Sequence, residues 1–200
     1  NIGRYYASAF SIDGKGYVCG GIDKNGDLGG IIECYDPNTN MWSTKTSMNT
    51  LRSNSTAFFI NGKGYVWGIG GESGYIDILE CYDPAINTWS YRASMSIIVS
   101  NAVAFAINGK GYVCGRKDLT GAGMQCYDPN TNTWSAKTSM NSVTYPTGSF
   151  IIGTSGYVCG GSTVECYDPI TDTWSVKAST SINRRFSTAF SIGNKGYVCC

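Results

Sequence analysis

The stretch CYDPNTNMW at residues 34–42 decides the fold, because close copies of it occur three more times along the chain. In each copy the tryptophan lies 8 residues after the cysteine, and a Gly-Tyr-Val triplet begins 22 residues after that tryptophan. The cysteines that open the copies are Cys34, Cys81, Cys126 and Cys166. Self-similarity at a fixed spacing of this size predicts a protein built from tandem structural repeats.

One segment of the repeat changes in length while the others do not. From the glycine of Gly-Tyr-Val to the following cysteine, the distance is 18, 17, 15 and 10 residues in the successive units. We therefore expect one loop of the repeat to absorb the length variation. We expect residues 1–200 to form a single domain, with units at 1–48, 49–95, 96–140 and 141–180 and a partial unit at 181–200.

Each unit is expected to contain four short strands. The apolar first strand ends at Asp13-Gly14, Asn61-Gly62 or Asn108-Gly109, dipeptides that tolerate the positive φ of a tight hairpin. The second strand contains Tyr-Val, the variable loop follows, and an Asp-Pro turn separates the third strand from the fourth. The 26 glycines and the low share of charged residues, 14%, also favour short strands joined by turns. Such units bury their faces by stacking radially, which predicts the blades of a β-propeller.

These landmarks resemble the Kelch repeat. The resemblance is carried by diglycines after the second strand, by the Tyr-Asp-Pro turn and by the tryptophan beyond it, and it covers essentially the whole chain. The diglycines are Gly20-Gly21, Gly70-Gly71 and Gly160-Gly161. The third unit departs from the pattern with Gly115-Arg116, and the fifth ends on Cys199-Cys200. The resemblance implies an all-β, Kelch-type β-propeller with four complete four-stranded blades and the first two strands of a fifth.

The partial fifth unit bears on the size of the ring. The chain begins at a first strand, so its own N-terminus does not supply the third and fourth strands that a fifth blade needs. Because Kelch-like rings commonly close with more than four blades, we expect this chain to be a portion of a larger ring. A second chain that completes the ring, and a four-bladed ring with a spare hairpin, are the alternatives.

The connections of each blade divide between two faces, because successive strands alternate in direction. One face carries the short turns between strands one and two and between strands three and four. The other carries the variable loops between strands two and three and the links from strand four to the next strand one. Rigid scaffolds usually place recognition on variable loops, which makes this second face the candidate binding face. Its candidate binding residues are Arg4, Tyr5, Arg52, Ser53, Asn54, Ser100, Asn101, Tyr145, Arg184 and Arg185.

Three of these arginines share one position, six residues before the phenylalanine of the first strand, where other units have Val99 and Thr144. Kelch propellers often line the mouth of the ring with arginine, serine, asparagine and aromatic residues, and a guanidinium group suits a carboxylate partner. The alternative is that each arginine braces a neighbouring blade or binds a loop carboxylate. The loop carboxylates considered are Asp23, Asp27, Glu72, Asp77 and Asp118.

The composition argues against several kinds of chemistry. The chain has no histidine, which excludes Ser-His-Asp and Cys-His nucleophiles, most catalytic zinc sites and the copper centre of galactose-oxidase-like propellers. An aspartate recurs once per blade in the Tyr-Asp-Pro turn, so we interpret it as an acceptor of backbone hydrogen bonds. We expect no enzyme activity, no cofactor and no metal. The net charge of +1 and the lack of a long apolar run argue against nucleic acid and membranes as partners.

The cysteines and aromatic residues recur with the repeat. We interpret the cysteines as small buried hydrophobic residues, with disulfide bonds between strands two and three, or metal binding, as alternatives. The repeated tryptophans and tyrosines predict packing between blades, in preference to a stacking platform for sugars or bases. Free thiols favour a reducing, cytoplasmic location, whereas the sequon at residues 54–56 leaves an extracellular location as the alternative.

The sequence thus predicts a non-catalytic protein-interaction module that holds a peptide or loop of another protein on the candidate binding face. A carbohydrate-binding or carbohydrate-processing propeller is one alternative, because Kelch-like rings also occur in such proteins. A structural or filament component, suggested by the high similarity of the repeats, is another.

Overall fold

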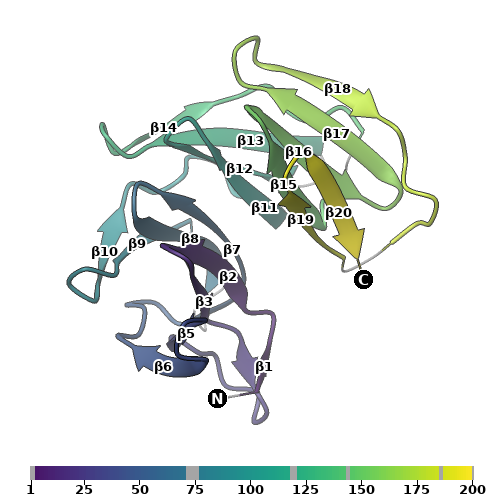
Figure 1. Ribbon diagram of the computed structural model, residues 1–200. Coiled ribbons are helices and arrows are strands. Elements are labelled where there is room, and N and C mark those ends of the chain that lie inside the picture. The colour runs from purple at the N-terminus through teal and green to yellow at the C-terminus, as the bar shows by residue number, and fades with distance from the viewer. Residues whose placement is uncertain (1–2, 71–76, 118–120, 143–144, 185–186, 200) are drawn as a thin grey trace. The chain divides into compact units, whose positions relative to one another are not determined.

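The computed structural model describes residues 3–70, 77–117, 121–142, 145–184 and 187–199, and every regular element in these ranges is a β-strand (Figure 1). The strands form four four-stranded antiparallel sheets and two two-stranded ones. Contacts divide the chain into two compact units, residues 1–96 and 97–200, which are described separately. The described part of the chain contains no helix long and apolar enough to cross a membrane.

The first unit contains two blades and one short strand pair. Blade 1 has the strand order β2-β3-β5-β6 and blade 2 the order β7-β8-β9-β10, while β1 pairs with β4. The bounds are β1 Arg4–Tyr5, β2 Ser8–Ile12, β3 Lys15–Cys19, β4 Ile22–Asp23, β5 Ile32–Asp36, β6 Met41–Lys45, β7 Arg52–Ile60, β8 Lys63–Gly70, β9 Leu79–Asp83 and β10 Thr88–Arg92.

The second unit contains two further blades and the first half of a fifth. Blade 3 has the order β11-β12-β13-β14, blade 4 the order β15-β16-β17-β18, and β19 pairs with β20. The bounds are β11 Ser100–Ile107, β12 Lys110–Lys117, β13 Gly121–Asp128, β14 Thr133–Ala136, β15 Gly148–Ile152, β16 Ser155–Gly160, β17 Thr163–Asp168, β18 Thr173–Lys177, β19 Thr188–Ile192 and β20 Lys195–Cys199. The predicted all-β fold, with four complete blades and two strands of a fifth, is confirmed.

The turns between strands one and two have the geometry that their sequences predict. In Asn61-Gly62 the φ angles are 48° and 76°, and in Asn108-Gly109 they are 51° and 72°. Asparagine and glycine reach this left-handed region at little cost, and a turn of this kind matches the twist of the flanking strands. In blade 4 only two residues separate β16 from β17, as the shortest variable loop predicts.

The Tyr-Asp-Pro turn is held by its aspartate. In blade 2, Asp83 Oδ1 accepts a hydrogen bond from the backbone N–H of Ala85 (3.0 Å), and Asp83 Oδ2 lies 2.7 Å from Lys63 Nζ. The same ion pair recurs as Lys15 with Asp36 and as Lys110 with Asp128. The predicted role of this aspartate as a backbone acceptor is confirmed, and the lysine of the strand 1–2 turn meets it on the same face.

Adjacent blades within a unit pack through one recurring contact. The ring of Phe10 in blade 1 covers Gly64 of blade 2 so closely that a Cβ atom on this glycine would lie 2.3 Å from the ring. Phe105 of blade 3 covers Gly156 of blade 4 at the same distance. The glycine of Gly-Tyr-Val is therefore required by the packing between blades, because any side chain there would occupy the space of the ring.

The tryptophans join adjacent blades. The Trp89 ring packs at 5.1 Å from the Tyr82 ring, and Trp89 Nε1 donates a hydrogen bond to the carbonyl oxygen of Thr46 in the link from blade 1 (2.8 Å). Trp174 makes the same bond to Thr138 (2.8 Å). The predicted packing of the tryptophans between blades is confirmed for these two residues.

The described cysteines are free thiols, as their interpretation as small hydrophobic residues requires. Cys199 is exposed, and the buried members are Cys19, Cys34, Cys81, Cys114, Cys126, Cys159 and Cys166. Burial raises the pKa of Cys19 to about 12, which suppresses the reactive thiolate. These buried thiols fill the interior and have little reactivity.

Candidate binding face

Arg52, at the start of β7, is fully buried. Its Nη1 donates to the backbone carbonyl oxygens of Val66 (3.4 Å) and Ile78 (3.1 Å), and its Nη2 pairs with the Glu80 carboxylate. Burial lowers the pKa of Arg52, and the neighbouring Glu80 carboxylate opposes that shift. Because a ligand has no access to this guanidinium group, the geometry supports a bracing role, within its own blade and not against a neighbouring blade as the alternative expected. The brace ties Arg52 to the third strand of its own blade and not to a loop carboxylate.

Arg4 has the same arrangement in blade 1. Its side chain is 8% exposed, its Nη1 donates to the carbonyl oxygens of Gly20 (3.2 Å) and Ile31 (2.9 Å), and its Nη2 lies 2.5 Å from Glu33 Oε2. The glutamate comes from β5, the third strand of the blade. Two of the predicted binding arginines are thus engaged inside their own blades.

The glutamate before each Cys-Tyr-Asp-Pro stretch is a structural residue that the sequence analysis missed. Glu80 is fully buried, and its carboxylate accepts hydrogen bonds from the backbone N–H groups of Asn49 (2.9 Å) and Thr50 (3.0 Å) in the link from blade 1. In blade 4 the equivalent contacts join Glu165 to the N–H groups of Asn141 and Ser142. A signal was available, because this position is glutamate in three units and glutamine in the other.

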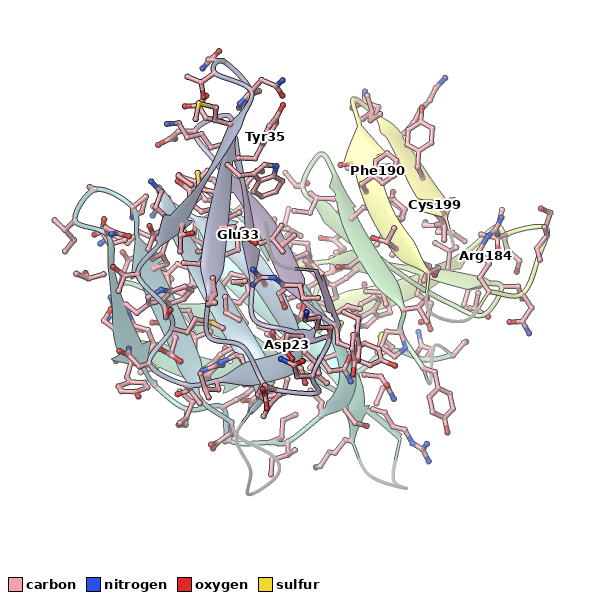
Figure 2. The ribbon with its side chains drawn as sticks, turned by 90° about the horizontal axis from the view of Figure 1, so that it is seen from below. Asp23, Glu33, Tyr35, Arg184, Phe190 and Cys199 are labelled. Carbon is pink, nitrogen blue, oxygen red and sulfur yellow. The ribbon has the colours of Figure 1, made fainter. Side chains whose placement is uncertain are left out.

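The remaining units fill the arginine position differently. Val99 occupies it in blade 3 and is buried. Arg184 in the partial fifth blade is half-buried and donates from Nη1 to the carbonyl oxygen of Ile182 (3.3 Å), in its own link (Figure 2). Thr144 and the predicted binding residue Arg185 lie outside the described residues.

Asn54 and Asn101 lie two residues after the arginine position, at an irregularity in the first strand. Their φ angles are 51° and 48°, and the register with the second strand shifts beside each of them. Asparagine adopts this left-handed conformation more readily than most residues, which gives both positions a backbone reason for their identity. Both side chains are exposed, and those of Ser53 and Ser100 are half-buried.

Exposed tyrosines lie on this face in both units. Tyr5 and Tyr6 are 52% and 53% exposed, and their rings meet edge to face with centroids 5.1 Å apart. In the second unit, Tyr145 is 52% exposed, its hydroxyl group accepts a hydrogen bond from Arg116 Nη1, and the Arg116 guanidinium carbon lies 4.8 Å from the ring centroid. In the sequence, Arg116 stands out only as a departure from the diglycine pattern, and that departure is the signal that could have placed it on the face.

A hollow of about 280 Å³ lies beside the variable loop of blade 1. Backbone of the glycines at 20, 21, 29 and 30 and the side chains of Leu28 and Leu51 form much of its wall. Asp23, one of the residues that line the hollow, shapes the loop, because its Oδ1 accepts the N–H groups of Asp27 (3.0 Å) and Asn25 (2.8 Å). Figure 2 labels Asp23. These two bonds hold the pKa of Asp23 below its usual value. The described residues contain no group of three or more acids or cysteines placed to hold a metal ion.

Two stretches of the chain match a known sequence motif. Residues 3–49 and 51–96 each match the Kelch motif. These two stretches are Kelch repeats. They contain blades 1 and 2, and the later units have the same strand order and the same landmarks, so the Kelch resemblance of the sequence is confirmed.

A solved structure carries the same fold. The structure of YjhT aligns with 98% of this chain and 76% of that chain, with a TM-score of 0.81 and 17% sequence identity. At this identity the likeness shows the propeller fold and nothing about a ligand. No curated protein matches the sequence.

Proposed function

We propose that this Kelch protein is a non-catalytic interaction module that binds a peptide or loop of another protein on the candidate binding face. The observation that carries the proposal is the contact of Arg116 with the exposed ring of Tyr145. Arginine and tyrosine are enriched among the residues that dominate binding energy at protein interfaces. A tyrosine already in contact with a guanidinium group presents a rigid surface, which lowers the entropy cost of binding.

The chemistry of this surface indicates the kind of partner. Arg116 and the exposed Lys117 place two positive charges at the end of β12, and Asn101 adds an exposed amide in the same unit. A guanidinium group binds a carboxylate through two parallel hydrogen bonds, while a tyrosine ring packs on an apolar side chain. The proposed ligand is therefore a segment with an aspartate or glutamate next to an apolar residue. In the first unit Tyr5 and Tyr6 offer a second contact surface.

The absence of catalysis in this proposal rests on the chemistry of the sequence. The chain has no histidine, and the aspartate that recurs in every blade accepts backbone hydrogen bonds in a turn. These carboxylates hold the turn, so they are poorly suited to act as an acid and base pair on a substrate.

The proposal is tested with peptides selected against the intact protein from a displayed random library. We expect acidic sequences to be recovered, and isothermal titration of the best peptide to give about tenfold to hundredfold weaker binding for Arg116→Ala and for Tyr145→Ala. Lys110→Ala, at the opposite end of β12 from Arg116, is the matched control and should bind as the wild type does. A library that yields no ligand, or a ligand that binds the Arg116→Ala and Tyr145→Ala proteins unchanged, contradicts the proposal.

The carbohydrate alternative is addressed by probing the same protein samples on a glycan array. The proposal expects no glycan to bind in a manner that depends on Tyr145 or Tyr5. A glycan that binds the wild type and is lost in Tyr145→Ala would replace the peptide as the ligand of this face.

A further inference from the structure

The hollow beside the variable loop of blade 1 has a wall that is held by backbone hydrogen bonds. The N–H groups of its glycines donate within the protein, from Gly20 to Ile31 (3.2 Å), from Gly21 to Arg52 (2.9 Å) and from Gly29 to Gly21 (2.8 Å). These bonds fix the loop against the start of the third strand and the link into blade 2. The hollow is therefore formed before a ligand arrives, which lowers the cost of binding.

These hydrogen bonds also indicate which charge fits the hollow. Successive free N–H groups in a glycine-rich loop form a concave site for anions. Here the N–H groups of Gly20, Gly21 and Gly29 are already used, so they are not available to a phosphate or a carboxylate. The wall thus offers little to an anion.

Two aspartates give the hollow its charge. Asp23 and Asp27 both line it, and hydrogen bonds from backbone N–H groups hold the pKa of Asp23 below its usual value, so this carboxylate is charged at neutral pH. Within the described ranges neither carboxylate forms an ion pair. Arg4 also lines the hollow, but its guanidinium group pairs with the Glu33 carboxylate. The uncompensated charge of the hollow is therefore negative.

The rest of the wall includes apolar side chains. Leu28 and Leu51 line the hollow, and Leu51 is 50% exposed although it is a large hydrophobic residue. A Cβ atom added to Gly30 would lie 2.9 Å from Leu51 Cδ2, so this leucine packs closely over the glycine. A ligand in the hollow therefore meets methyl groups as well as carboxylates.

We propose that the hollow binds a basic side chain of a partner protein, with its methylene stem on Leu28 and Leu51 and its cationic group at Asp27. Arginine and lysine combine these two properties, because their apolar stems lie along hydrophobic surface while the charged group stays near water. Arginine is favoured, since its planar guanidinium group forms two parallel hydrogen bonds with a carboxylate. The volume of about 280 Å³ is at the low end of ligand pockets and fits one long side chain. The proposal is independent of the peptide-binding site at Arg116 and Tyr145.

The probe that tests this proposal is a capped arginine, Nα-acetyl-arginine methylamide, titrated into the intact protein and followed by the backbone amide signals in NMR spectra. We expect saturable shifts of the signals of glycines 20, 21, 29 and 30, which line the hollow, in the millimolar range. The matched probe is capped citrulline, which has the same shape without the charge and should bind at least about threefold more weakly. The affinity for arginine should also fall in 1 M salt, where the screening length is about 3 Å.

Two variants should change the affinity for arginine in opposite directions. Asp27→Asn keeps the shape of an exposed side chain and removes its charge, so we expect binding to be about threefold to tenfold weaker. Lys24→Gln removes an exposed cation from the same loop and should strengthen binding by up to about threefold. Asp13→Asn is the matched control, because it makes the same change of charge in the strand 1–2 turn of the same blade, where other blades have Asn61 and Asn108. It should bind arginine as the wild type does.

Three outcomes would each overturn the proposal. The first is that arginine does not shift the signals of the glycines that line the hollow. The second is that citrulline binds as tightly as arginine, which would show that the charge is not recognised. The third is that Asp27→Asn and Asp13→Asn have equal effects, which would reduce the role of the aspartates to the overall charge of the protein.

Discussion

Blades 2 and 3 share their strand order and their turns, yet they fill one buried pair of positions with different chemistry. In blade 2 the pair is Arg52 with Glu80, both fully buried. In blade 3 the same two positions hold Val99 and Gln125, which are 1% and 3% exposed. Blade 3 lacks the cation and has a neutral amide in place of the acid, so these two blades differ at both positions.

The difference between the two blades indicates the role of the arginine position. A buried charge is very costly unless it is paired or hydrogen-bonded, so the buried carboxylate of Glu80 depends on Arg52. Blade 4 keeps the buried acid with Thr144 at the arginine position, and there Glu165 accepts hydrogen bonds from the backbone N–H groups of Asn141 and Ser142. A ligand-binding arginine would have no reason to depend on the residue before Cys-Tyr-Asp-Pro in its own blade. We therefore interpret Arg52 and Glu80 as one structural element, which blade 3 replaces by an uncharged one.

The largest change in stability is expected when blade 2 receives only one of the two residues that blade 3 has at the buried pair. Arg52→Val removes the cation and leaves the Glu80 carboxylate buried with the backbone N–H groups of Asn49 and Thr50. We expect the free energy of unfolding to fall by about 3–5 kcal/mol, as measured by urea denaturation. Tyr5→Ala, which truncates an exposed side chain, is the control and should change stability little. A loss below about 1 kcal/mol would mean that the pair is not the element described above.

Completing the exchange should recover much of that loss. The double variant Arg52→Val with Glu80→Gln carries the pair that blade 3 uses, so no charge remains buried. We expect it to be at least about 2 kcal/mol more stable than Arg52→Val alone, which a double-mutant cycle with Glu80→Gln measures. Strictly additive effects of the two substitutions would show that these positions do not act as a unit.

The smallest change in stability is expected at the surface lysine–aspartate pair, which blades 2 and 3 share. The Lys63–Asp83 and Lys110–Asp128 pairs lie at the surface, and the hydrogen bond from the lysine lowers the pKa of each aspartate from 3.8. Because the folded-state pKa is lowered, the contribution is complete above the ordinary value and is lost as the pH falls below it. Lys63→Met and Lys110→Met should thus each reduce stability slightly at neutral pH and not at all in strong acid.

Salt provides the control for that comparison. Surface ion pairs are screened at high ionic strength, so the small difference between wild type and either lysine variant should shrink in 1 M salt, where the screening length falls to about 3 Å. A difference that persists in salt and acid, or that is large in one blade and absent in the other, would contradict the equivalence of the two turns.

Much of the fold could be predicted from the sequence because its signals are local and repeated. Asn61-Gly62 encodes its own hairpin, and the spacing from Cys81 to Trp89 returns in every complete unit. The exposed asparagines of the candidate binding face could be located in the same way, although their backbone role was not foreseen. The role of the arginines could not be predicted, because sequence spacing gives the position of Arg52 in the repeat and not the groups that its guanidinium group contacts.

The repeat, the strands and turns of each blade, and the variable loop follow from the sequence alone. These depend on contacts between near neighbours and on an alternation of apolar residues that recurs in each unit. Which side chains are available to a partner depends instead on the tertiary structure. It brings Glu80 to Arg52 from 28 residues away and Arg116 to Tyr145 across 29 residues, burying the first pair and exposing the second. Burial is a property of the packed blades, so two arginines that the sequence alone does not distinguish by exposure acquired different roles.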